Sequence, residues 1–202
     1  MATVKEIPAK LVAELRARTG AGMMDCKKAL EETGGDLDKA AEALRKSGAV
    51  KAEKRAGREA TQGLIGSYVH HDGSIGALVE LNCETDFVAR TPEFKELAKE
   101  LAMHVASAKP LALRIEDLPG DVVERERRVY MEQVAQQKKP ENIRAKIVDG
   151  MLKKFYEENV LLEQRYVRDD KRTIGELVKE LSAKTGENVQ LRRFVRFERG
   201  GV

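Results

Sequence analysis

The 202-residue sequence has no tryptophan, only two cysteines and no long hydrophobic run. No apolar stretch approaches the ~20 residues that a transmembrane helix needs, and the first ten residues, MATVKEIPAK, lack the apolar centre of a signal peptide. We therefore expect a cytoplasmic protein with no membrane partner. Cys26 and Cys83 stand far apart and outside any CxxC pattern, which disfavours a zinc site or a redox pair and predicts two free thiols in a reducing compartment.

Motifs of nucleotide chemistry and catalysis are also missing. The chain has neither a GxxxxGK[ST] loop nor a GxGxxG between a strand and a helix. His70 and His71 are adjacent in a predicted strand, so they should point to opposite faces, and they lack acidic or cysteine partners at ligand spacing. We expect solvated or packing histidines there, a boundary position for His104, and an inert buried thiol at Cys83. The sequence thus predicts no metal, no cofactor and no enzyme; an enzyme using Cys83 or a histidine is a minor alternative.

What the chain does contain is typical of a globular, helix-rich protein, with 42% hydrophobic and 35% charged residues. Between Pro8 and Ser47 the apolar residues recur at helical spacing, interrupted at "TGAG" (19–22) and "TGGD" (33–36), where glycines end one helix and Asp36 can cap the next. We expect a compact three-helix module at residues 1–46. Residues 47–62 are rich in charge and poor in large apolar groups, which predicts a linker or an exposed helix.

Residues 63–202 read as a core of helices packed on a small sheet. Two β-rich runs flank Asp72-Gly73, a strong turn signal that predicts an antiparallel hairpin. One helix is predicted to begin at Pro92, with Thr91 as its cap. Further helices are predicted near 120–137, 141–160 and 173–185, the last opening at Thr173 and stopping at Gly186. The run "NVQLRRFVRFE" (188–198) predicts a strand that joins the hairpin, giving a three-stranded antiparallel sheet and an α+β fold class.

Two basic clusters leave nucleic acid as an alternative partner. The net charge is only +3, from 37 basic and 34 acidic residues mixed along the chain. The clusters comprise Lys51, Lys54, Arg55 and Arg58, and then Arg192, Arg193, Arg196 and Arg199, the latter interleaved with Phe194 and Phe197. Such interleaving suits stacking on single strands, but a solvated strand face gives the same pattern and is the interpretation we prefer. RNA or ribosome binding is kept as the alternative, and it predicts affinity that falls steeply with salt.

The stretch "NCETDFVAR" (82–90) raises the main functional question. From the residues alone, Phe87 reads as a core residue and Asp86 as a local cap for a turn. However, "LRARTGAGMMDCKKALEETGGDLDKAAEALRKSG", "VELNCETDFVART" and "KIVDGMLKKFYEENVLLEQ" resemble the elongation factor Ts family, in order and over nearly the whole chain.

The resemblance implies a guanine nucleotide exchange factor that binds elongation factor Tu, both GDP-bound and nucleotide-free. The family's TDFV motif matches Thr85, Asp86, Phe87 and Val88. In the family the phenylalanine wedges into the nucleotide domain of elongation factor Tu and disturbs its magnesium site, which implies that Phe87 is exposed in the free protein. The N-terminal module is similar to ubiquitin-associated domains, and the resemblance gives it a second contact with the partner through Gly22, Met23 and Met24.

This sequence departs from the family at two places. Longer family members carry a second core subdomain, so for a chain with one core the resemblance implies a homodimer. Within "LLEQRYV" the chain has Arg165 and Tyr166 where the family pattern has proline and phenylalanine. The resemblance therefore does not predict the turn geometry at these two residues.

Overall fold

The computed structural model describes residues 7–136 and 140–201. Contacts divide the chain into two units, which we describe separately. The first contains the residues up to Leu64, Leu81–Lys95 and Leu177–Leu191, and the second contains Ile65–Glu80, Glu96–Glu176 and the residues from Arg192 on. Within the described residues no helix is long and apolar enough to span a membrane.

The N-terminal part of the first unit consists of three helices: α1 (Ala9–Thr19), α2 (Met23–Glu32) and α3 (Leu37–Arg55). Gly20 ends α1 in the left-handed region, at φ 68°, a conformation that costs glycine little. Asp36 caps α3, because its carboxylate accepts hydrogen bonds from the amides of Asp38 and Lys39, and this lowers the pKa of Asp36. The predicted glycine breaks and the Asp36 cap are confirmed.

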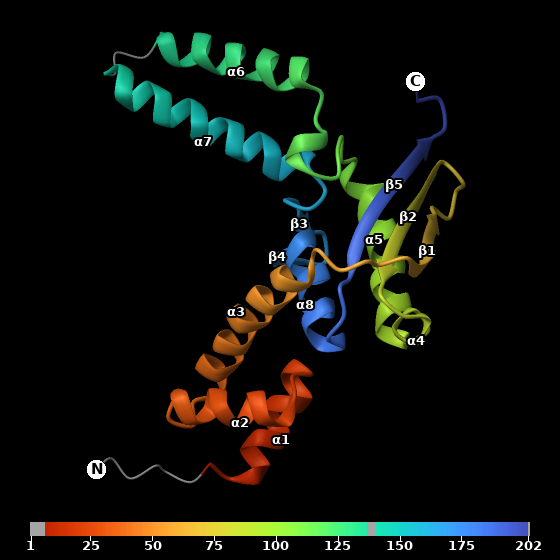
Figure 1. Ribbon diagram of the computed structural model, residues 1–202. Coiled ribbons are helices and arrows are strands. Elements are labelled where there is room, and N and C mark those ends of the chain that lie inside the picture. Colours follow the sequence, from red (N-terminus) through yellow and green to blue (C-terminus); the bar gives the residue numbers. More distant parts are fainter. Residues whose placement is uncertain (1–6, 137–139, 202) are drawn as a thin grey trace. The chain divides into compact units, whose positions relative to one another are not determined.

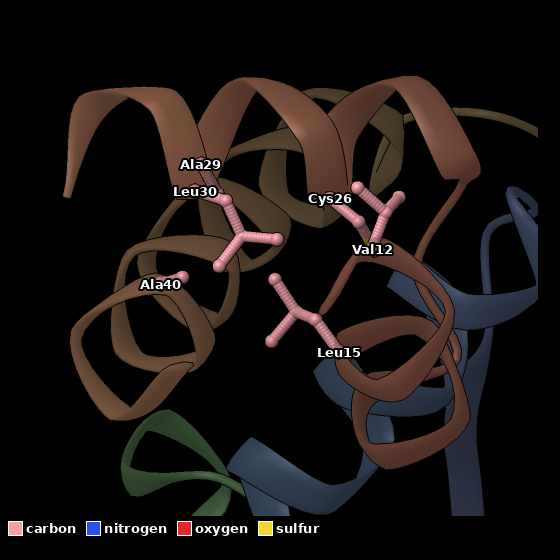
Figure 2. Close-up of a cluster of buried hydrophobic side chains, with 6 residues drawn as sticks. All are labelled: Val12, Leu15, Cys26, Ala29, Leu30 and Ala40. Atoms are coloured by element: carbon pink, nitrogen blue, oxygen red, sulfur yellow. The ribbon is translucent and has the colours of Figure 1, made fainter. Parts of the chain in front are cut away.

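These three helices surround a small apolar cluster. Figure 2 shows that its buried side chains come from all three helices, and they are Val12, Leu15, Cys26, Ala29, Leu30 and Ala40. The predicted boundary at residue 46 falls inside α3, which runs without a break to Arg55. The charged segment therefore begins as the last turns of this helix. Residues 1–6 of the predicted module lie outside the described residues, and the module's limits stay a prediction.

A three-stranded antiparallel sheet is formed by β1 (Gln62–Val69), β2 (Ile75–Cys83) and β5 (Gln190–Glu198), in the order β1-β2-β5 (Figure 1). The hairpin turns at Asp72-Gly73, where the Asp72 carboxylate accepts from the amide and hydroxyl of Ser74. One face of the sheet packs on α5 (Pro92–Ala108) so closely that a Cβ on Gly66 would lie 2.3 Å from the carbonyl oxygen of Ala98. The predicted hairpin and α+β fold class are confirmed.

The second unit contains the helices α6 (Gly120–Ala135) and α7 (Glu141–Asn159), which run in opposite directions (Figure 1) and are preceded by the short 3-10 helix η1 (Ile115–Asp117). The two helices pack on one another around Val134, Val148 and Leu152. Residue 137, where the first of these helices was predicted to end, lies outside the described residues. A two-stranded sheet of β3 (Arg165–Tyr166) and β4 (Asp169–Thr173) was not predicted, and it contains the two residues that depart from the family pattern.

The final helix, α8 (Ile174–Thr185), begins where the sequence predicts. The Thr173 hydroxyl accepts from the Glu176 amide while the Glu176 carboxylate accepts from the Thr173 amide, a reciprocal capping box. The helix ends before Gly186, whose amide donates to the Ser182 carbonyl. Residues 187–190 then lead from α8 into β5.

Candidate functional site

The TDFV segment forms a single helical turn immediately after β2. The four-residue helix α4 spans Asp86–Ala89, and Thr85 precedes it with extended backbone angles, φ −125° and ψ 155°. The Thr85 hydroxyl accepts a hydrogen bond from the Val88 amide at 3.4 Å, so Thr85 is the N-cap. The prediction of an Asp86 cap is wrong by one position. Asp86 is the first helical residue, and its carboxylate pairs with Arg90 at 2.7 Å.

Phe87 projects from this turn into solvent. Its side chain is 80% exposed, so the interpretation of Phe87 as a core residue is wrong. The family resemblance implies an exposed Phe87, and the structure agrees with that expectation. The reason lies in helix geometry: successive residues are ~100° apart, so residues two positions apart lie on nearly opposite sides. Ala89 is the buried residue of α4, and this places Phe87 on the outward side.

A carboxylate from the far end of the chain supports the entry to the turn. Glu187 Oε2 accepts from the backbone amides of Glu84 and Thr85, at 3.1 and 3.0 Å, and Glu187 Oε1 accepts from the Thr85 hydroxyl at 2.6 Å. The exit is held by Thr91, whose hydroxyl donates to the Val88 carbonyl at 2.8 Å. Glu187 was not predicted, because nothing in a run of polar residues after a helix indicates a partner about one hundred positions away.

Both cysteines are free thiols, as predicted, and both are buried, which the sequence predicted for Cys83 and left open for Cys26. Cys83 ends β2 beneath the turn, and its thiol donates to the Thr85 carbonyl oxygen at 3.1 Å. Burial, with a further contribution from the Glu187 carboxylate, raises the pKa of Cys83 to about 11. A thiol with so high a pKa is a poor nucleophile at neutral pH.

The second predicted partner contact lies at the start of α2. Gly22 is the N-cap residue in an extended conformation, and Met23 and Met24 are 53% and 76% exposed. Two neighbouring exposed methionines provide an adaptable apolar surface, because their side chains are unbranched and flexible.

His70 is half-buried and His71 is exposed, in agreement with the prediction of solvated or packing side chains, but two other expectations for the histidines are wrong. His70 and His71 follow the end of β1 at Val69, so they do not alternate across a strand, and their ring centroids lie 4.3 Å apart. His104 is fully buried and not at a boundary, because the last turns of α5 are buried on almost every side. Its Nε2 lies 3.0 Å from Gln164 Oε1, and burial lowers its pKa. Across residues 7–136 and 140–201 no group of three His, Cys, Asp or Glu side chains could hold a metal ion.

Several residues of the two basic clusters have partners within their own unit. In the first cluster Lys51 pairs with Asp25 at 3.0 Å, Arg55 donates to the Ser182 carbonyl, and Arg58 lies 3.4 Å from Glu84. In the second, the contacts join Arg193 to Glu80, and Arg196 to Glu198 and to the carbonyl of Ala106. Phe194 is half-buried, whereas Phe197 is 67% exposed.

Comparison with known proteins gives a consistent result. The family model described as "Elongation factor TS" matches residues 27–201. Proteins named Elongation factor Ts from Thermosipho melanesiensis and Thermotoga maritima are each 55% identical to this chain, over 96% of it and over 99% and 97% of their own lengths. The protein of the same name from Fervidobacterium nodosum is 54% identical, over 96% of this chain and 99% of its own length.

Proposed function

The chain belongs to the elongation factor Ts family, and we propose that it is a guanine nucleotide exchange factor for elongation factor Tu in the cytoplasm. It acts as a binding protein, with no covalent chemistry and no cofactor of its own. The observation that carries the proposal is the exposure of Phe87 on a turn whose two ends are hydrogen-bonded to the rest of its unit.

The proposed mechanism is a wedge. Magnesium and fixed donors hold the phosphates of bound GDP, so release requires those groups to move apart. Phe87 enters the nucleotide domain of elongation factor Tu and fills a pocket that exists only when the magnesium site is disturbed. Burial of one phenylalanine contributes ~1.5 to 3 kcal/mol, which shifts a two-state equilibrium by about 10- to 150-fold if only one state has the pocket.

The other residues of the motif direct this side chain. Thr85 caps the turn, Val88 supplies the amide that is capped, and Asp86 is held by Arg90 at the first position of the helix. We assign Gly22, Met23 and Met24 to a second contact with the same partner, because their exposed apolar surface suits a supplementary contact of low specificity.

We also propose that the protein forms a homodimer through its sheet. The face of the sheet opposite α5 exposes large apolar side chains on all three strands, namely Ile65, Val69, Leu78, Val195 and Phe197. β5 is in addition an edge strand. Exposed apolar side chains gathered on one face of a sheet are a common mark of a protein interface, and a second copy offers a face of matching chemistry.

The exchange proposal is tested by mixing the protein with elongation factor Tu loaded with a fluorescent GDP and following release of the nucleotide. Faster release with increasing protein is expected, and it should depend on Phe87. Unchanged release at saturating protein would overturn the proposal. Sedimentation tests the dimer, which should give twice the chain mass.

A further inference from the structure

The turn that presents Phe87 is too short to be rigid by itself. An isolated helical turn is unfavourable, because it fixes several backbone angles for a single hydrogen bond. The geometry of α4, four residues long, must therefore come from its surroundings, which are the packing of the buried Ala89 and the groups that hold its ends. At the entry, those groups are the two oxygens of the Glu187 carboxylate.

The contacts of this carboxylate form a connected series that leads to α4. The Thr85 hydroxyl has one proton, which it donates to Glu187 Oε1 at 2.6 Å. Its lone pairs are then available to the Val88 amide, the capping interaction of the helix. Glu187 thus fixes the orientation of the hydroxyl as well as two successive backbone amides.

Glu187 is itself held in place by its neighbours in the chain. Its carbonyl oxygen accepts from the Ser182 hydroxyl. The amide of the next residue, Asn188, donates to the Glu84 carboxylate at 2.6 Å. Glu84 and residues 187–188 therefore bind each other reciprocally: each segment offers a carboxylate to an amide of the other.

We propose that Glu187 is a positioning residue for Phe87, one that holds the α4 turn in the orientation in which the ring meets elongation factor Tu. The proposal rests on the proposed role of Phe87. It assigns no contact with the partner to Glu187, whose effect passes entirely through the turn. Without Glu187, the turn has to become ordered during binding, and the entropy lost in that step lowers the affinity for the state of elongation factor Tu in which the magnesium site is disturbed.

Three substitutions separate the geometry of Glu187 from its charge. Glu187→Gln keeps an acceptor at the same distance and loses the charge; the Thr85 hydroxyl can rotate to accept from the new amide. Glu187→Asp keeps the charge but withdraws it by one methylene group. Glu187→Ala removes both. We expect stimulated GDP release to slow about ten-fold for Glu187→Ala and nearly as much for Glu187→Asp, and to stay within about three-fold of the parent for Glu187→Gln. If Glu187 acted on the partner through its charge, Glu187→Asp would be the better variant.

A double variant tests whether the effect passes through Phe87. Combining Glu187→Ala with Phe87→Ala should release GDP no more slowly than Phe87→Ala alone, because the turn then has no ring to present. The control is Glu132→Ala, which removes an exposed glutamate from α6 and should match the parent. Full activity of Glu187→Ala, or additive losses in the double variant, would overturn the proposal while leaving the exchange function intact.

Amide hydrogen exchange of the free protein supplies a readout that does not depend on the partner. The amides of Glu84 and Thr85 should exchange faster in Glu187→Ala and Glu187→Asp than in the parent, with protection restored in Glu187→Gln. Unchanged protection of these two amides in all three variants would also refute the positioning role of Glu187. If circular dichroism shows that Glu187→Ala does not fold, the order of the Gln and Asp variants in both assays decides the question. Failure of the parent to stimulate release would instead refute the exchange function.

Discussion

Replacement of Phe87 by alanine should affect exchange far more than stability. The side chain is 80% exposed, so about a fifth of its surface is removed from water in the free protein. A fully enclosed phenylalanine buries ~150 to 250 Å², and a fifth of that, at ~25 cal/mol per Å², is worth about 1 kcal/mol. A phenylalanine in the core would cost ~3 to 5 kcal/mol on truncation.

Phe94 provides the matched control. It is the same residue type, seven positions further along the chain, and it is fully buried at the start of α5. Chemical denaturation of Phe87→Ala and Phe94→Ala should therefore show a free energy of unfolding that falls by at most about 1 kcal/mol in the first and by ~3 to 5 kcal/mol in the second.

In the exchange assay, by contrast, the loss of the exposed Phe87 ring should have a large effect. Phe87→Ala should slow stimulated GDP release by much more than it weakens overall binding, because its side chain favours one state of the partner. Chelation of magnesium should reduce the difference in GDP release rate between the variant and the parent, because elongation factor Tu then lacks the ion in both reactions. A Phe87→Ala variant that unfolds as readily as Phe94→Ala, or that releases GDP as fast as the parent at ordinary magnesium, would refute the reasoning.

Three further predictions follow from other parts of the structure. Met24→Ala should weaken binding to elongation factor Tu by a few-fold in a titration without changing the thermal midpoint, because Met24 is 76% exposed; a marked loss of stability would contradict the proposed contact. Phe197→Asp places a charge on the exposed face of the sheet, and sedimentation should show a shift from dimer to monomer, whereas an unchanged mass would exclude this face as the interface. The folded state raises the pKa of Cys83 from 9.0 to about 11, so the native protein binds more protons than the unfolded chain in that window and loses stability as the pH rises through it. Denaturation at pH 8 and pH 11 should show a loss roughly 2 kcal/mol larger in the parent than in Cys83→Ala, and equal losses would show that the thiol is not the group responsible.

Local patterns in the sequence were sufficient for most of the fold. Glycine breaks, the Asp36 cap, the Asp72-Gly73 turn and the Thr173 helix start each depend on residues within a few positions, and all four are confirmed. The sheet of β3 and β4 was missed because its strands are short and strongly charged, with none of the β-branched or alternating pattern that marks a strand.

The site was only partly predictable, for a different reason. Phe87 was assigned to the core from its residue type, and only the resemblance to a family indicated that it is exposed. Its true position depends on the phase of a four-residue helix, which is set by the burial of Ala89. His104 was misplaced in the same way, because a single apolar stripe does not reveal that the end of α5 is enclosed on its other sides. In each case, burial is decided by elements that are distant in the sequence.

Thr85 and Glu187 are 102 positions apart in the sequence, and this separation bears on how the protein becomes active during its own synthesis. A chain that has emerged from the ribosome only as far as α8 already contains the whole TDFV motif, but the carboxylate that orders its entry has not yet been added. Contacts of such large sequence separation close late in folding, because the intervening loop must lose entropy first. A nascent chain should therefore order the turn that carries Phe87 only after residue 187 has been added, and translation that stops short of residue 187 would yield a protein with the motif but without the Glu187 hydrogen bonds.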